Sequence, residues 1–585
     1  MNFKSLFAKA FFFPVILFFL ALFIRTIWLD RIPIGIVHDN MIFALNAKAF
    51  FYTGHDVTGK WNPFSLSPLP DEPSQSEIAY IYLAPFIGPL PSSLFSAHIF
   101  FALLNSFFIV ILYLLVKKLL QNSILAFLVG LVACFNPWEI FFGRSAFETS
   151  SAMIFYILGF YVLISVSNWK KILAFVPLAL GFYTYMAYKV TLIPYTAIIS
   201  FFTFIQIDKK KNIFPYITLL LLGIAVSLLF LFKAYIGHDI NRLGEVTFFS
   251  STNISDEVNY ERRIAIQNPL ELVFSNKLFV AGKYLAGKYI GAFSINNLFV
   301  DSERLLRFHI YNHGHFYYVD LLFFLLGFCF LFAYKRKLWL LFVSIMLIAP
   351  LPSVLSSQGV TYVMRSSLYM PFFYIFIGTG IWYAITWFKN KKYIVISSIV
   401  IGLIYAILVG NFLYTYFFIQ PIYASEAQTF SSRLLSKYAT LALEQNKQIN
   451  IVLGSPRVQF KDFVYYANLY NSTNVKTITK AFYTHNYIYK NASFVTCNSI
   501  KSLDKNTIYI FDPGEKCLLF KNVKDTITIP QLSDSGSVFD IYQDSICSNY
   551  QLHTYISKIT LQDLSVEKLN ISDFCQTFLI KYSPH

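Results

Sequence analysis

Eleven long apolar stretches dominate this sequence, at about 11–29, 94–116, 123–142, 149–167, 172–188, 190–207, 213–235, 317–334, 338–356, 366–388 and 393–418. A helix needs about 20 apolar residues to cross a bilayer, where backbone groups find no water. The 585 residues are 56% hydrophobic and 13% charged, whereas soluble domains carry roughly 25% charged residues. The sequence therefore predicts an α-helical polytopic membrane protein with about eleven transmembrane helices.

Basic residues mark every second junction between these stretches. The clusters are Lys4 and Lys9, Lys117 and Lys118, Lys170 and Lys171, Lys209 to Lys211, Lys335 to Lys337, and Lys389 with Lys391 and Lys392. Positively charged loops stay in the cytoplasm, so we expect the amino terminus inside and the carboxy terminus outside. This placement accounts for the net charge of +16 without a nucleic-acid partner.

The predicted topology gathers the longer polar segments on one face. The membrane part is expected over 1–420, with outer loops at 30–93 and 236–316, and an extracytoplasmic domain over 421–585. The inner loops are too short to hold a site. We therefore expect any chemistry at the outer face of a plasma (inner) membrane.

The predicted outer domain alternates strand and helix patterns. Residues 449–454 and 507–511 have the pattern of buried strands that end in turns, and 460–470 has that of a helix. An α/β domain is therefore expected.

Four of the six cysteines lie in this domain. An even number in an oxidising compartment favours two disulfides, with four free thiols as the alternative. Proximity in sequence favours Cys497–Cys517 and Cys547–Cys575 among the three possible connectivities.

Several polar motifs follow one another at the predicted outer ends of the helices. They are Asp39-Asn40 with the loop from Thr53 to Pro63, Asn136-Pro137 with Arg144 and Glu148, Tyr183 and Tyr185 with Lys189, His313-Gly314-His315, and Met364-Arg365 before Pro371. In order and placement, over roughly 1–470, they resemble motifs of the GT-C glycosyltransferases, specifically the dolichyl-phosphate-mannose protein mannosyltransferase and ArnT-like group. The sequence departs from that pattern at two positions. Asn40 stands where a second acid is usual, and His98 where an arginine commonly opens the second helix.

The resemblance implies a GT-C fold and an enzyme that transfers a sugar, with mannose as one candidate, from a polyprenyl-phosphate donor. The acceptor would be a hydroxyl of a protein, a glycolipid or an envelope glycan. A carboxylate would take the acceptor proton, and fixed positive charge would stabilise the departing phosphate. Asp39 is the expected base, and Arg144, Lys189 and Arg365 are expected to bind the donor phosphate. No cofactor is implied as a requirement, and a divalent metal is left open.

Each of these residues has a structural alternative. Asp39 would instead cap a helix that starts near Met41. His38 either orients that carboxylate or is merely solvated, and Asp56 either supports the site or forms a turn. His313 and His315 suggest a metal pair, but two histidines alone do not fill a coordination sphere.

The basic candidates also have alternatives. Arg144 and Glu148 are four residues apart, which places them on one helix face. They would form either a local ion pair or a phosphate ligand positioned by Glu148. Lys189 and Arg365 would otherwise extend to lipid headgroups.

The second outer loop is rich in arginine, with Arg242, Arg262, Arg263, Arg304 and Arg307. It is expected either to cover the site and contact a phosphate or to form amphipathic helices on the membrane surface. Two other functions remain open for the whole chain. One is a transporter or flippase for a lipid-linked glycan, and the other is a non-catalytic, glycan-binding membrane assembly protein.

Overall fold

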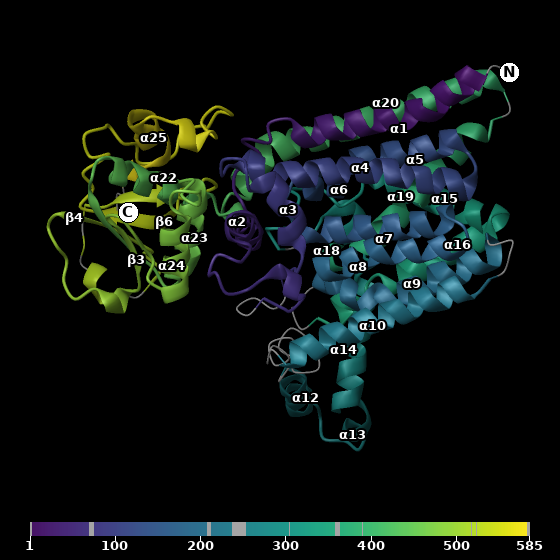
Figure 1. The fold of residues 1–585 in the computed structure, drawn as a ribbon, viewed down its shortest axis with the longest axis horizontal. Coiled ribbons are helices and arrows are strands. Elements are labelled where there is room, and N and C mark those ends of the chain that lie inside the picture. Colours follow the sequence, from purple (N-terminus) through teal and green to yellow (C-terminus); the bar gives the residue numbers. More distant parts are fainter. Residues whose placement is uncertain are drawn as a thin grey trace.

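The computed structural model describes residues 3–69, 75–207, 212–236, 253–303, 305–356, 363–388, 390–515, 517–521, 523 and 525–581. Lys209 to Lys211, Lys389, Arg242 and Arg304 lie outside this set. Figure 1 shows a block of long helices side by side and a sheet domain stacked against one end of it. The amino terminus lies at the opposite end of the block.

The helix block is built mainly from the following helices. They are α1 (Phe3–Thr26), α4 (Leu94–Leu120), α5 (Ser123–Phe135), α6 (Pro137–Gly143), α7 (Glu148–Ser165), α8 (Phe175–Thr184), α9 (Met186–Gln206), α10 (Phe214–Ile236), α15 (Tyr318–Tyr334), α16 (Arg336–Ile348), α17 (Leu351–Val354), α19 (Met370–Thr386) and α20 (Lys391–Tyr414). Within the described residues, seven helical segments are long and apolar enough to cross a membrane, or eight if the bent pair α5–α6 counts as one span. Each of the eleven predicted stretches falls on these helices, but that number of spans stays a prediction.

Two predicted spans are not straight helices. The chain bends by 60° between α5 and α6, where Asn136 is extended and Pro137 begins the new helix. A residue before proline avoids the helical region, and proline has no backbone N–H to donate. The predicted span 172–188 is also broken, because Tyr185 is extended between α8 and α9. Both breaks lie among the motif residues.

Glycine allows two membrane helices to approach closely. A Cβ at Gly327 of α15 would lie 1.8 Å from the carbonyl oxygen of Phe376 in α19. A Cβ at Gly380 of α19 would lie 1.9 Å from the carbonyl oxygen of Phe323 in α15. Small residues at such crossings let the two backbones touch, which supplies packing that lipid cannot.

Two further groups of helices leave the block. Helices α2 (His38–Thr53) and α3 (Ala79–Ile87) lie between the block and the sheet domain, and α12 (Asn253–Ile264), α13 (Glu271–Phe274) and α14 (Lys277–Gly291) project from its side. This projecting arm exposes apolar side chains such as Leu272 and Leu278, together with Arg262 and Arg263. Amphipathic helices on the membrane surface stay the prediction for this arm.

The sheet domain is built on seven strands in the order β2-β3-β1-β4-β6-β5-β7. The strands are β1 (Gln448–Val452), β2 (Ile488–Tyr489), β3 (Ala492–Val495), β4 (Thr507–Phe511), β5 (Ile527–Pro530), β6 (Ser537–Tyr542) and β7 (Ile580–Lys581). β1 pairs in parallel with β3 and β4, and the other described pairs are antiparallel. The predicted strands at 449–454 and 507–511 are confirmed as β1 and β4.

Helices and disulfides complete this domain. The helices are α22 (Phe430–Glu444), α23 (Pro456–Tyr466), α24 (Val475–Thr484) and α25 (Ile571–Phe578). α23 confirms the predicted helix but begins four residues earlier, with Pro456 in its first turn. The disulfides Cys497–Cys517 and Cys547–Cys575 are both formed, as proximity in sequence predicted.

Candidate functional site

Asp39 lies in the first turn of α2, at the end of the block that faces the sheet domain. The helix begins at His38, and Val37 occupies the cap position without a side-chain hydrogen bond. The alternative that Asp39 caps a helix near Met41 is therefore wrong. A carboxylate in the first turn is stabilised by the helix dipole.

The carboxylate of Asp39 pairs with Arg307, a residue of the second predicted outer loop. Arg307 Nη1 lies 3.2 Å from Asp39 Oδ2, and the two side chains are 46% and 47% exposed. Exposed ion pairs contribute at most about 1 kcal/mol. Arg307 can therefore leave Asp39 at small cost when a substrate arrives.

His38 precedes Asp39 and is partly buried. Burial, followed by the positive charges of Lys461, Arg307 and Arg457, lowers the pKa of His38 to about 4. The imidazole is therefore neutral near pH 7. Lys461 and Arg457 belong to α23, so the sheet domain contributes positive potential to the surroundings of Asp39.

Asn40 differs sharply from its neighbour. Asn40 is buried, whereas the side chain of Asp39 is 47% exposed. A carboxylate at position 40 would be costly to bury without a paired charge. The departure at Asn40 therefore leaves Asp39 as the accessible acid of this helix turn.

Asp56 lies in a tight turn after α2. Its carboxylate accepts hydrogen bonds from Thr58 Oγ1 (2.8 and 2.9 Å), Lys60 N (3.0 Å) and Trp61 N (3.1 Å). Its side chain is buried. These contacts fit the turn alternative, since every partner belongs to the 56–61 loop.

Arg144 is fully buried and is held by backbone carbonyl groups. Its Nη1 donates to Ile24 O (2.8 Å), and its Nη2 donates to Ile27 O (2.8 Å) and Ile32 O (2.7 Å). Ile24 lies in the last turn of α1, where carbonyl groups lack partners within the helix, and Ile27 and Ile32 follow that helix. Arg144 therefore supplies hydrogen-bond donors to the end of α1 and to the segment after it. This environment gives Arg144 an anchoring role, and contact with a donor phosphate stays a prediction for this residue.

Arg144 and Glu148 do not share a helix face, which corrects a second expectation. α6 ends at Gly143, Phe147 is extended, and α7 begins at Glu148. Among the described residues, no ion pair joins the two side chains. Glu148 instead interacts electrostatically with Asp39 and Lys189. His98, which is buried on α4, interacts electrostatically with Arg144.

Lys189 pairs with Glu77, a residue that the sequence did not single out. Lys189 Nζ lies 2.9 Å from Glu77 Oε2 and 3.0 Å from Oε1, and the two side chains are 6% and 0% exposed. Burial raises the pKa of Glu77, and the ammonium group counteracts that rise. A lone acid in a loop carries no pattern, so only the fold identifies this partner. Lys189 is thus neutralised inside the protein and does not extend to headgroups.

Arg365 belongs to a separate polar cluster. It donates to Ser356 Oγ and interacts with Tyr185, which lies at the break between α8 and α9. Glu303 is nearby and accepts a hydrogen bond from Val363 N, and burial raises its pKa to about 8. Glu303 was also missed by the sequence, because the fold alone brings it to Arg365.

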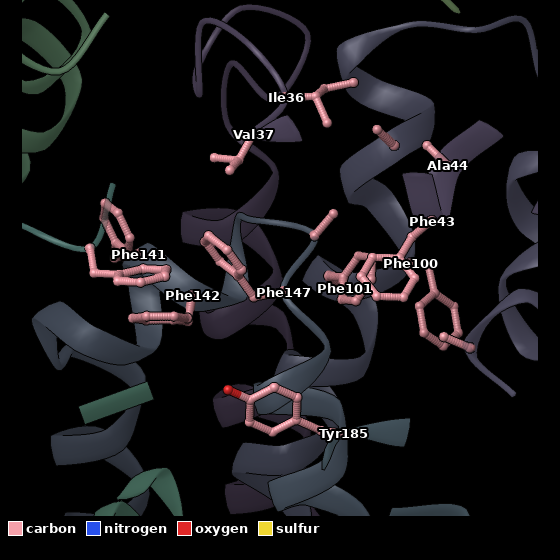
Figure 2. Close-up of a cluster of buried hydrophobic side chains, with 14 of the residues drawn as sticks. Ile36, Val37, Phe43, Ala44, Phe100, Phe101, Phe141, Phe142, Phe147 and Tyr185 are labelled. Carbon is pink, nitrogen blue, oxygen red and sulfur yellow. The ribbon is translucent and has the colours of Figure 1, made fainter. Parts of the chain in front are cut away.

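Apolar side chains lie beneath the turn that carries Asp39. Figure 2 shows the rings of Phe100, Phe101, Phe141, Phe142 and Phe147 in a layer between Ile36 and Val37 on one side and Tyr185 on the other. These residues come from the 36–37 loop, α4, α6 and the α6–α7 junction. The site is therefore polar at Asp39 and apolar immediately below it.

The histidine motif 313–315 provides no visible metal centre. His313 Nε2 lies 3.2 Å from Asn411 Nδ2, and His315 is fully buried. Burial lowers the pKa of His315 to about 3. Within the described part of the chain, no three His, Cys, Asp or Glu side chains form a group that could hold a metal ion.

Comparison of the whole structure with solved structures places this geometry in a known architecture. ArnT from Cupriavidus metallidurans bound to undecaprenyl phosphate matches with a TM-score of 0.52 at 10% identity, covering 92% of this chain and 99% of ArnT. The chain has the GT-C fold. The sequence matches no protein-family model and no curated protein.

Two other solved structures match less closely. ArnT in the apo state gives a TM-score of 0.48 at 11% identity, over 90% of this chain and 97% of ArnT. The oligosaccharyltransferase AglB from Archaeoglobus fulgidus, in complex with an inhibitory peptide and a dolichol-phosphate, gives 0.43 at 10% identity, over 93% and 75%. At these identities the likeness concerns the fold, and the chemistry depends on this chain's own residues.

Proposed function

We propose that this protein is a membrane glycosyltransferase that moves a sugar from a polyprenyl-phosphate donor to an acceptor hydroxyl, with Asp39 as the base. The observation that carries the proposal is the half-exposed Asp39–Arg307 pair at the end of a GT-C helix block. It places an accessible carboxylate and an accessible guanidinium 3.2 Å apart. Transfer to a hydroxyl from a phosphate-linked donor needs one group of each kind.

The reaction has a simple balance. Asp39 takes the proton of the acceptor hydroxyl as the acceptor oxygen bonds to the anomeric carbon. The bond from that carbon to the donor phosphate breaks, and polyprenyl phosphate leaves with the electron pair. A single displacement of this kind inverts the configuration at the anomeric carbon. Arg307 is the cation best placed to stabilise the leaving phosphate.

Other features support a lipid-borne donor. A solved structure with this fold, ArnT from Cupriavidus metallidurans, holds undecaprenyl phosphate. The remaining phosphate candidates, Lys189 and Arg365, already have partners in Glu77 and in Ser356 and Tyr185. We therefore assign the phosphate contact to Arg307. Mannose stays one candidate sugar, and a protein, a glycolipid or an envelope glycan stays a candidate acceptor.

The test is the Asp39→Asn variant in membranes supplied with labelled polyprenyl-phosphate sugar. Loss of the base should lower the transfer rate by about 100-fold or more. Asp30→Asn is the matched control, because Asp30 is also an exposed acid paired with an arginine, Arg31, at 3.5 Å. Transfer at the wild-type rate by Asp39→Asn would show that Asp39 is not the base.

The same membranes distinguish the two other functions. A flippase would move labelled lipid across reconstituted vesicles without sugar transfer. A non-catalytic assembly protein would bind the donor lipid and show no turnover with any acceptor. Either result in the wild type would replace the enzymatic proposal.

A further inference from the structure

The peptide that leads into α2 is held by side chains of the chain beyond 421. Gln428 Oε1 accepts from Ile34 N (3.0 Å), and Arg433 Nη1 donates to Ile34 O (2.7 Å). Tyr466 OH accepts from Ile36 N (2.9 Å), and Thr429 Oγ1 donates to Ile36 O (2.8 Å). Both backbone groups of Ile34 and of Ile36 are therefore bonded to residues about 400 positions away.

Gly35, between these two residues, brings the backbones into direct contact. A Cβ at this position would lie 1.9 Å from the carbonyl oxygen of Gln428. Only glycine fits at such a distance, because a side chain at position 35 would push one of the two backbone segments away. The position of the peptide is thus defined by shape as well as by hydrogen bonds.

The side chains of Gln428, Thr429, Arg433 and Tyr466 thus form a clamp on the peptide 34–36. Arg433 connects this clamp to the rest of the sheet domain. Its guanidinium is buried and bonds Glu567 through Nε (2.6 Å) and Nη2 (2.5 Å), and Nη2 also donates to Leu564 O (3.0 Å). Bidentate pairs of this kind are geometrically specific. The peptide before Asp39 is therefore tied to the body of the domain and not to a loose tail.

We propose that the sheet domain positions the base, with Tyr466, Thr429, Gln428 and Arg433 as positioning residues for Asp39. The inference rests on the proposed function. Two residues, Val37 and His38, separate the clamped Ile36 from Asp39, and Val37 O already accepts the first helical hydrogen bonds of α2 from Asn40 N and Met41 N. A shift of the clamped peptide therefore moves the first helix turn and its carboxylate.

The rate of transfer depends on the geometry at the reacting atoms. A misplacement of about 1 Å in a catalytic group can cost on the order of 100-fold in rate. In the peptide before Asp39, the four side chains bond to backbone atoms only. Among the described residues, no hydrogen bond or ion pair joins them to the Asp39 carboxylate. Their loss should thus lower kcat and leave the KM for the donor unchanged.

A second set of contacts between the same two parts offers a matched control. Tyr465, adjacent to Tyr466 on α23, donates from its hydroxyl to Ser93 O (3.0 Å) and lies 3.2 Å from Ser96 Oγ at the start of α4. This tyrosine joins the sheet domain to the block without touching the peptide before Asp39. If both tyrosines only docked the sheet domain onto the block, loss of either hydroxyl would have the same effect on kcat.

The experiment compares Tyr466→Phe with Tyr465→Phe in the full chain in membranes. We expect Tyr466→Phe to lower kcat for labelled donor by about 10-fold or more with KM unchanged, and Tyr465→Phe to stay within about 2-fold of wild type. Thermal unfolding of both variants should change by similar amounts, because each loses one tyrosine hydroxyl from the interface. Equal kcat for the two variants would overturn the positioning role.

A readout without turnover separates this inference from the proposed function. In a Cys329→Ser background, Asp39→Cys is labelled with a water-soluble thiol reagent, alone and together with Tyr466→Phe or Tyr465→Phe. Tyr466→Phe should change the labelling rate several-fold, and Tyr465→Phe should leave it unchanged. Identical rates would refute the clamp even if the wild type transfers sugar. A selective change would support the clamp even if the wild type proves inactive.

Discussion

Arg307 Nη1 and Asp39 Oδ2 lie 3.2 Å apart although 268 positions separate the two residues in the chain. The pair joins the first turn of α2 to the second predicted outer loop. It brings together an acid that the sequence singled out and a cation that the sequence left among several arginines.

Arg307→Ala should lower kcat/KM for the donor by about 100-fold, because the leaving phosphate loses its cation in the transition state. Arg307→Lys should retain part of the rate, since a point charge remains without the planar fork. Initial rates with labelled donor measure both. Arg31→Ala is the control, because Arg31 also pairs with an exposed aspartate, Asp30, and is itself partly exposed. Normal kinetics for Arg307→Ala would exclude Arg307 as the phosphate contact.

Arg144→Lys should destabilise the protein by about 3 kcal/mol or more. The lysine keeps the charge but cannot serve all three carbonyl groups that Arg144 reaches, and buried polar groups without partners cost about 1–3 kcal/mol each. Thermal unfolding in detergent measures the loss. A phosphate-binding role would instead raise the donor KM while leaving the unfolding temperature unchanged.

Glu77→Gln should also be strongly destabilising, by about 3–5 kcal/mol, because the buried ammonium group of Lys189 loses its counter-charge. The double variant Glu77→Gln with Lys189→Met removes both charges and should recover much of the stability. Unfolding temperatures of the two single variants and the double variant form the test. Additive losses would show that the pair is not coupled.

His38 should make stability depend on pH. Its pKa in the folded protein is about 4, below the ordinary value of 6.5, so the folded state binds fewer protons than the unfolded state. Its contribution to stability is therefore complete above about pH 6.5 and is lost as the pH falls from 6.5 towards 4.

The comparison is between wild type and His38→Gln at pH 7.5 and pH 5. The unfolding temperature of the variant should fall less between pH 7.5 and pH 5 than that of the wild type. His55→Gln, which changes a partly exposed histidine after α2, should leave the wild-type pH dependence intact. A His38→Gln protein as acid-sensitive as wild type would contradict the assignment.

The local features of this protein were predictable from the sequence. The apolar stretches fall on helices of the block, the strands at β1 and β4 were recognisable, and both disulfides join the nearest cysteines. Hydropathy and turn signals depend on neighbours within a few residues, and these are read directly from the chain. Asp39 was singled out in the same way, from its place after the first apolar stretch.

The partners of the charged groups were decided by the tertiary structure alone. Arg144 meets carbonyls more than 110 positions away, Lys189 meets Glu77, and Ile34 meets Arg433 across 399 positions. A buried charge is stabilised by whichever groups the fold brings within reach, and no spacing in the sequence records them. The sequence by itself therefore determined the helices, the domain type and the candidate base. The fold decided which cations are already engaged and that the sheet domain holds the peptide before that base.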